Sequence, residues 1–254
     1  MMRSLFLMSL VVGSSAEALE ARDTAEVLKK GDVNAGVFGP LNVGLGDGME
    51  LQTHPLVSLL SPNAVLRKRH GQFAGGALTG EYGLSVPTYG LRFLQGDKAG
   101  GFFPASKSLP LLVVPSLGAV WTKACSSKAV LSARGDLAVG VPFGPVDVPS
   151  TGEGLLDLLF APVVGSYRAR LGVMYDRALL ERLRLRADLQ VWLHGLERSP
   201  YSVSAGLAFD VGLWRYASGR SARFTAGVMV LNSDSRAFGG GRSTDFLPTL
   251  DLIY

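Results

Sequence analysis

The chain has 254 residues, of which 32 are glycine, and only 18% of its residues are charged, against about 25% in ordinary soluble domains. Hydrophobic residues make up 47%, which excludes a disordered chain, and the glycines show no three-residue period, which excludes collagen. The net charge of +4 comes without a basic run longer than residues 67–70, so nucleic acid is not an expected partner.

The first 18 residues have the features of an export signal. Arg3 lies near the start, residues 5–12 are apolar, and Ala16 and Ala18 are small residues at the two positions that signal cleavage requires. The apolar stretch is far shorter than the ~20 residues that a membrane-spanning helix needs. We therefore expect cleavage after Ala18 and export of the rest of the chain.

Apolar and polar side chains alternate along much of the remaining sequence. The alternation is strictest over 201–213, where every odd position is apolar and the even positions are small or polar, and it is nearly as regular over 183–194. Weaker versions occupy 49–54, 131–141, 167–176 and 224–231. A two-residue period is typical of β-strands with two different faces.

Turn residues divide these segments into about ten predicted strands of an all-β, antiparallel barrel. Among the turn signals are Asp47-Gly48, His70-Gly71 and Asp176-Arg177. The strands are expected near 48–54, 63–70, 73–83, 112–122, 129–141, 163–176, 182–194, 201–214, 221–232 and 245–254. A further strand at 32–38 raises the count to twelve if it has a partner near 86–94.

The length of the strands and the placement of charge favour a transmembrane barrel. Several predicted strands have ten or more residues, as membrane strands do, whereas soluble strands average about 5 to 6. Charged side chains gather on the face opposite the apolar one, as expected when apolar residues contact lipid. The candidate lumen-lining residues are Glu50, Arg134, Asp136, Arg168, Arg170, Arg184, Arg186, Asp188 and Asp210. A soluble barrel has the reverse orientation, and periodicity alone does not choose between the two.

The connections also alternate in length. The longest ones, over 84–111, 142–162 and 233–244, all follow odd-numbered strands, so antiparallel pairing brings them to one side. Transmembrane barrels have this asymmetry, with short periplasmic turns and longer external loops.

The C-terminal residues carry a family resemblance. The chain ends in an aromatic residue, and Phe246, Leu250, Leu252 and Tyr254 share one strand face. This pattern resembles the terminal signal of Gram-negative outer-membrane β-barrel proteins, which the barrel-assembly machinery recognises. Pro248 interrupts the pattern and predicts a loop end or a bulge.

Other segments extend this resemblance. Residues 30–63, with Gly36–Leu41 and Thr53–Leu56, are similar to the opening of a poorly characterised group of such barrels. An aromatic girdle is expected from Tyr82, Tyr167, Tyr175, Trp192, Tyr201, Trp214 and Tyr254. The resemblance implies a signal peptide over 1–18, a periplasmic segment over 19–31 and a transmembrane barrel over 32–254. It also implies contact with outer-membrane lipid and, during insertion, with the assembly machinery.

Catalytic and metal motifs are weak, and we do not expect an enzyme or a cofactor. The single cysteine, Cys125, excludes an internal disulfide, and the three histidines lack metal-ligand spacing. One arrangement is compatible with lipid hydrolysis, namely His194 with Ser199 or Ser202. Alternation turns His194 towards the lumen, however, and nucleophilic catalysis also needs a third, orienting group.

The lumenal charges allow two functions. In a narrow barrel the arginines at 134, 168, 184 and 186 pair with Glu50 and the aspartates at 136, 188 and 210 in a structural network. In a twelve-stranded barrel the same arginines line a narrow water path that favours anions. We therefore expect an outer-membrane barrel that is either structural or a small passive pore. Two alternatives stay open: an outer-membrane lipid-modifying enzyme, and a soluble secreted barrel that binds an apolar ligand.

Overall fold

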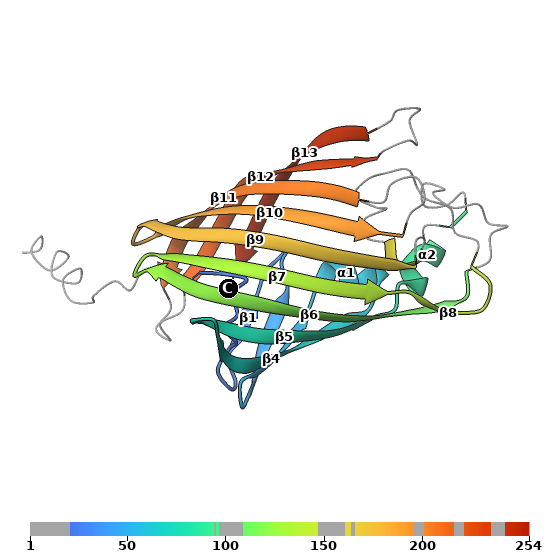
Figure 1. Ribbon diagram of the computed structural model, residues 1–254, viewed down its shortest axis with the longest axis horizontal. Helices are drawn as coiled ribbons and strands as arrows, with labels where there is room; N and C mark the ends of the chain where they lie inside the picture. The colour runs from blue at the N-terminus through green and yellow to red at the C-terminus, as the bar shows by residue number, and fades with distance from the viewer. Residues whose placement is uncertain are drawn as a thin grey trace, which may run out of the picture.

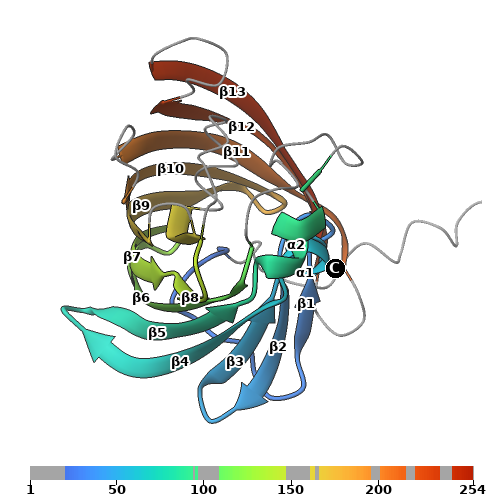
Figure 2. The ribbon, with the colours of Figure 1, turned by 90° about the vertical axis from the view of Figure 1, so that its right-hand side faces the viewer.

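A computed structural model of the protein describes residues 21–93, 95–96, 109–146, 161–163, 166–195, 201–215, 221–234 and 242–253. Within these residues, thirteen strands form one antiparallel sheet, and twelve of them follow one another around a nearly closed barrel (Figures 1 and 2). The strands are β1 (Val33–Ala35), β2 (Leu41–Gly46), β3 (Met49–Thr53), β4 (Asn63–Phe73), β5 (Gly76–Ser85), β6 (Leu111–Ser126), β7 (Ala129–Val139), β8 (Val141–Phe143), β9 (Tyr167–Leu180), β10 (Leu183–His194), β11 (Tyr201–Arg215), β12 (Ser221–Asp234) and β13 (Arg242–Ile253).

The barrel closes between its first and last strands. Gly36, just after β1, bridges Ile253 of β13, and the Val37 amide donates to the Leu252 carbonyl at 2.9 Å. The Phe38 amide donates to the Asp251 carboxylate at 3.0 Å and strengthens the same junction. β8 stands outside the closed path and pairs with β6. The predicted fold class, an antiparallel β-barrel, is thus confirmed.

All ten predicted strands are present, with ends that differ by up to several residues, and β1 and β2 complete the twelve. The proposed pairing of 32–38 with a strand near 86–94 is wrong. Segment 32–38 pairs instead with β2, and Thr88–Phe93 forms the short helix α2, in which the Leu91 amide donates to the Pro87 carbonyl at 3.0 Å. Pro87 precedes the helix, and proline, which lacks an amide proton, is poorly suited to the interior of a strand.

Two predicted turns are wrong. His70-Gly71 lies inside β4, where Gly71 has φ +101° and a register shift marks a bulge; the turn to β5 is made by Ala74 and Gly75. Asp176-Arg177 lies inside β9, which continues to Leu180. Positive φ at a glycine is as compatible with a bulge as with a hairpin turn, and the sequence does not separate the two.

Pro248 is also placed differently from the prediction. It lies within β13, paired with Val228 of β12, and no register shift interrupts that ladder. Among the described residues, the other side of β13 meets β1 and its following turn only near 251–253. Near Pro248, β13 therefore has a described neighbour on one side only, and such edge positions are where strands tolerate proline.

Alternation places apolar side chains on the outside of the barrel and charged ones inside. On neighbouring strands, Leu171, Leu189 and Leu207 are 63%, 48% and 46% exposed. Charged residues on the opposite face, such as Asp176 and Asp210, are 0% and 1% exposed. The orientation is the reverse of that in a soluble barrel with an apolar core.

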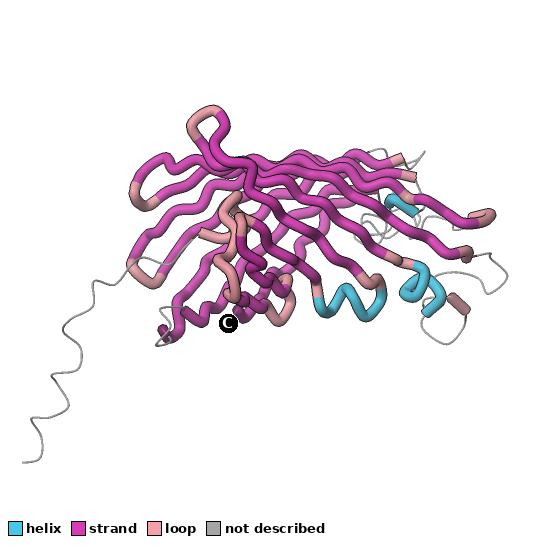
Figure 3. The backbone as a smooth tube through the Cα atoms, turned by 90° about the horizontal axis from the view of Figure 1, so that it is seen from below, coloured by secondary structure: helices cyan, strands magenta, loops and turns pink. Residues whose placement is uncertain are grey.

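The two ends of the barrel differ. Short turns, such as those joining β6 to β7 and β9 to β10, lie at one end, and long connections with α2 and β8 lie at the other (Figures 1 and 3). A second short helix, α1 (Pro55–Leu60), joins β3 to β4. None of the described helices is long and apolar enough to span a membrane.

An apolar cluster lies at the long-connection end, beneath α2. Leu91 of this helix packs with side chains from the inner faces of β6 and β7 and from the connecting segments. The buried members are Leu91, Leu109, Leu112, Val114, Ala138 and Val163. The inner surface is therefore apolar at this end and charged along most of its remaining length.

Candidate functional site

Residues 22–28 cross the lumen near its short-turn end, and we call them the strap. They form no strand and are held by side chains of the barrel wall. The Arg22 guanidinium donates to the Thr225 hydroxyl at 2.8 Å and lies 3.4 Å from the Asp251 carboxylate and 3.7 Å from that of Asp210. The strap therefore begins against β11, β12 and β13.

The middle of the strap is bound mainly through its backbone. The Ala25 amide donates to the Thr122 hydroxyl at 2.8 Å, and the Ala25 carbonyl accepts from the Thr79 hydroxyl at 2.5 Å. The Ala25 side chain is fully buried against Ala77 and Val120. The Ala25 side chain is a single methyl group, so this apolar contact is small. The middle of the strap is held mostly by polar contacts to its backbone.

Arg67 of β4 links the strap to the wall. Its guanidinium donates to the Thr24 carbonyl at 2.5 Å, to Glu50 at 2.8 Å and to Glu81 at 3.2 Å. The arginine is 6% exposed and both carboxylates are buried. Each buried charge is thus compensated by an opposite one, as burial requires.

The far end of the strap runs towards β1. The Glu26 carboxylate pairs with Arg69, and the Leu28 amide donates to the second oxygen of Glu50 at 2.8 Å. Gly44 of β2 allows the chain to pass, because a Cβ at this position would lie 1.9 Å from the Lys29 carbonyl oxygen. A glycine in β2 is thus required by the path of the strap.

Asp23 lies in a strongly positive environment. Its carboxylate is 2.9 Å from the Arg186 guanidinium. Burial alone would raise the pKa of Asp23, but the positive charges of Arg22, Arg186, Arg134 and Arg67 outweigh it and lower this pKa from 3.8 to about 2. Asp23 is therefore ionised throughout the physiological range.

A second ion-pair cluster lies deeper in the lumen. Asp136 of β7 pairs with Arg170 and lies 3.9 Å from Arg168, and both guanidiniums stand over the Trp192 ring, at 5.1 and 5.4 Å from its centroid. Arg134 pairs with Glu81 at 3.0 Å. The Arg134-Gly135-Asp136 tripeptide therefore contributes to the inner network, with each charge paired to a different strand.

The remaining predicted residues also lie on the inner face. Arg184 pairs with Asp176 at 2.5 Å, and Asp188 accepts from Gln190 at 3.1 Å. Asp210 accepts from the Thr225 hydroxyl at 2.6 Å. All nine candidate lumen-lining residues thus have a polar contact inside the barrel.

Most of their partners differ from those expected. Within the predicted set, only Asp136 pairs with a predicted arginine. The missed partners are Arg22, Asp23, Arg67, Glu81 and Asp176. The strap was missed because it has no alternation, and Asp176 because it was placed in a turn. Arg67 and Glu81 do carry a detectable signal, since both face inward by the same two-residue period.

His194 and Ser202 are adjacent on the inner face. The His194 Nε2 atom lies 3.2 Å from the Ser202 hydroxyl, and the two residues are 2% and 1% exposed. Ser199 lies outside the described residues. Strand pairing explains the contact, because Ser202 lies opposite Trp192, two positions before His194.

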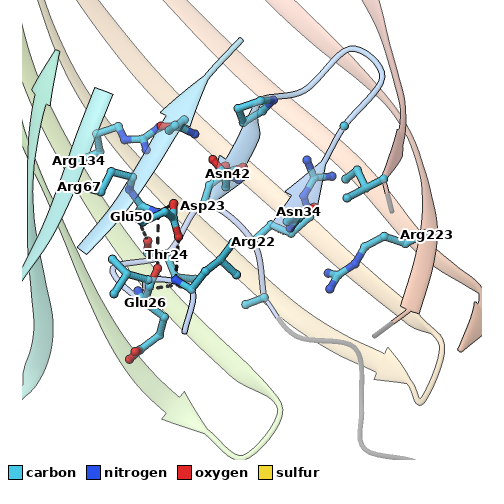
Figure 4. A pocket seen from close by; sticks show the side chains of 17 residues that line it. Arg22, Asp23, Thr24, Glu26, Asn34, Asn42, Glu50, Arg67, Arg134 and Arg223 are labelled. Atoms are coloured by element: carbon cyan, nitrogen blue, oxygen red, sulfur yellow. Dashed lines mark hydrogen bonds and ion pairs between the residues drawn. The ribbon is translucent and has the colours of Figure 1, made fainter. Parts of the chain in front are cut away.

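A polar cavity of about 160 Å³ separates the strap from the wall formed by β1 to β3 (Figure 4). Asn34, Asn42 and Gln52 line it from the wall, and Arg22 and Glu26 from the strap. A polar cavity of this size has room for several water molecules. The strap is thus held closely on one side and borders a polar space on the other.

The predicted C-terminal signal faces outward where it is described. Phe246 and Leu250 are 72% and 54% exposed, Leu252 is half-buried, and Tyr254 lies outside the described residues. The prediction that Trp192 belongs to the aromatic girdle is wrong, because its side chain faces the lumen, where the guanidiniums of Arg168 and Arg170 lie over its ring. Exposed on the outer surface are Tyr82, Tyr167, Tyr175, Tyr201 and Trp214.

The described residues contain no group of three or more His, Cys, Asp or Glu side chains arranged to hold a metal ion. Comparison with known proteins gives no relative: no family model matches the chain, and no curated protein and no solved structure matches it significantly.

Proposed function

We propose that the protein is an outer-membrane β-barrel that acts as a structural barrel or as a narrow passive pore with a charged lumen. One observation carries the proposal: long strands present exposed apolar side chains outward and buried charges inward. Eight strands of the barrel have 11 to 16 residues, at least the roughly 9 to 11 residues that a tilted membrane strand needs. An apolar outer surface of this kind is stable in lipid and unfavourable in water.

Other features fit the same location. The outward-facing tyrosines suit a membrane interface, and the exposed Phe246 and Leu250 suit recognition by an assembly machinery. The export signal read from residues 1–18 provides the route out of the cytoplasm. In this account, residues 19–31 are periplasmic and reach into the lumen from that side.

The contents of the lumen favour low conductance. The strap crosses the lumen at the short-turn end, and the apolar cluster around Leu91 occupies part of the opposite end. Planar-bilayer recording of the purified protein separates the two roles. Small, ohmic steps support a narrow pore, whereas a silent bilayer containing correctly inserted protein supports a structural barrel.

The transmembrane proposal is tested by an arginine scan along β11. Leu207→Arg near the middle of the strand should make folding into vesicles less favourable by about 2 to 4 kcal/mol, because the charge enters the hydrocarbon layer. Leu213→Arg, on the same face near the strand end, is the matched control and should cost about 0 to 1 kcal/mol. If Leu207→Arg and Leu213→Arg both change the free energy of folding by equally small amounts, the result would indicate a barrel that folds in water.

A lipid-modifying enzyme is the second candidate, and the 3.2 Å contact between His194 and Ser202 is the observation that favours it. Both side chains are almost fully buried, which separates them from a lipid substrate. Incubation with phosphatidylethanolamine and phosphatidylglycerol vesicles tests this candidate. Hydrolysis by the unsubstituted protein that is lost in Ser202→Ala would support the enzyme.

The soluble, ligand-binding barrel is the least compatible with the geometry. It requires apolar side chains in the lumen, whereas the lumen is mostly charged and the large apolar side chains are outside. We therefore do not carry this alternative further.

A further inference from the structure

We propose that the short-turn end of the lumen is a binding site for an extended peptide, and that the strap is an exchangeable ligand of this site. The peptide class is defined by adjacent basic and acidic residues followed two positions later by a small residue, as in Arg22, Asp23 and Ala25. The proposal goes beyond a pore or structural role, because it concerns what occupies the lumen and how tightly.

The strap is bound as peptides are bound and is not built into the wall. Wall strands pair through backbone ladders, but the strap forms no ladder with any described strand. Its backbone is held instead by side chains, with Thr79 and Thr122 on Ala25 and Arg67 on the Thr24 carbonyl. Such contacts recognise an extended backbone whatever its side chains are.

Two charged side chains add sequence specificity. Arg22 meets carboxylates on β11 and β13, and Asp23 meets Arg186 on β10. The two neighbouring residues thus contact different strands, and the pockets have opposite signs. A peptide with the charges reversed would place like charges together, which is unfavourable.

The attachment is suited to exchange because it is polar, with hydrogen bonds to the strap backbone and ion pairs to Arg22, Asp23 and Glu26. Ala25 is the one strap residue in a buried apolar cluster of the described chain, and its side chain is small. The Glu26–Arg69 pair is exposed and is weakened by salt, whereas the more buried pairs of Arg22 are screened less. The polar cavity beside β1 to β3 leaves space on one side of the strap, so its displacement does not require the wall to open.

Departure of the strap would leave opposite charges without their partners. Arg186 would lose Asp23, while Asp210 and Asp251 would lose Arg22. Uncompensated charges in a confined site are costly, so a second peptide with the same charge order binds more favourably than none. We therefore expect one peptide to replace another at this site, and we do not expect the site to stay empty.

The test measures access to Ala25 in the full-length protein. Ala25→Cys is introduced with Cys125→Ser, and maleimide labelling is followed in detergent micelles. The parent should label slowly because residue 25 is buried, and adding Arg22→Gln with Asp23→Asn should accelerate labelling at least tenfold. Lys30→Gln with Asp47→Asn is the matched control: it removes one charge of each sign from exposed positions and should leave the rate unchanged.

A synthetic peptide of residues 19–30 provides the exchange arm. Added in excess to the Ala25→Cys, Cys125→Ser parent, it should compete with the strap for the site and accelerate the labelling of residue 25, and a peptide with Arg22 and Asp23 interchanged should not. The same labelling rate in the parent and the neutralised variant, or no difference between the two peptides, would overturn the proposal.

If the Arg22→Gln, Asp23→Asn variant does not fold, a salt titration of the parent tests the proposal instead. Raising NaCl from about 0.1 to 1 M shortens the screening length roughly threefold and should accelerate labelling of the parent. A rate independent of salt would show a fixed strap. Because all these readouts are made in micelles, their failure is distinguishable from failure of the outer-membrane proposal, which the β11 arginine scan tests in vesicles.

Discussion

At the scale of single residues, buried ion pairs dominate the interior of the barrel, and Arg67 lies at the centre of one network of them. Its guanidinium bonds to Glu50 and Glu81 on the two neighbouring strands and to the Thr24 carbonyl of the strap. Removing one member of a buried ion network leaves the others charged in a poorly solvated site, which costs more than the network contributes when complete.

Arg67→Met should therefore lower the free energy of unfolding by about 3 to 5 kcal/mol, because it removes the guanidinium that pairs with the buried Glu50 and leaves Glu81 with Arg134 alone. Denaturant titration in detergent micelles measures the change. Lys68→Met removes the same charge from the exposed neighbouring position, and we expect a change within about 0.5 kcal/mol. Similar losses in both variants would show that Arg67 is not the centre of the network.

Asp23 gives the strap a defined pH dependence. Its pKa is lowered from 3.8 to about 2 by the surrounding guanidiniums, so the ionised carboxylate stabilises the folded state fully above about pH 4. That contribution falls as the pH drops from about 4 towards 2, because the unfolded chain then binds the proton first.

The stability difference between the unsubstituted protein and Asp23→Asn should accordingly be constant between pH 5 and 7 and shrink below about pH 4. Urea titrations of both proteins at each pH provide the comparison, in which protonation of groups common to both proteins cancels to first order. A difference that persists unchanged to pH 2 would contradict the assigned environment of Asp23.

At the scale of elements, strict alternation was a reliable guide and irregular segments were not. Strands β10 and β11 have uninterrupted two-residue periods, and both were predicted within two residues at each end. β1 lies within the optional strand predicted at 32–38, and the strap has no period. β2 was not predicted, although Leu41, Val43 and Leu45 alternate with polar or small residues. The bulge at Gly71 was mistaken for a turn because positive φ serves both structures.

The candidate site was predictable only in part for the same reason. Alternation indicates which side of a strand faces inward, and so it placed the nine charged residues on the lumenal side. It does not indicate which strands lie across the lumen from one another. The partners of Arg186 and Asp210 lie in the strap, more than 150 residues away, and no local pattern predicts such a contact.

The junction between β2 and the strap gives a prediction at this scale. Gly44→Ala should expose residue 25 to maleimide in the Ala25→Cys, Cys125→Ser background, because the new methyl group would overlap the Lys29 carbonyl oxygen and displace the strap. Gly71→Ala strains the bulge in β4 but has no atom within 4 Å of its new Cβ, so it should leave labelling slow. Equal labelling in the two variants would contradict the role of Gly44.

At the scale of the whole molecule, the barrel combines an apolar outer surface with a charged interior. This arrangement supports the proposal that lipid surrounds the strands, since water would disfavour the exposed leucines and valines on most of the long strands. The strap and the apolar cluster around Leu91 then account for the contents of the lumen.

Location in the outer membrane is the central claim, and fractionation of the expressed protein tests it most directly. Cells of a Gram-negative host are separated into soluble, inner-membrane and outer-membrane fractions, and each fraction is run on SDS gels with and without boiling. We predict a band in the outer-membrane fraction that migrates differently before boiling, as a closed, detergent-resistant barrel does. A band wholly in the soluble periplasmic fraction, with no shift on boiling, would contradict the account.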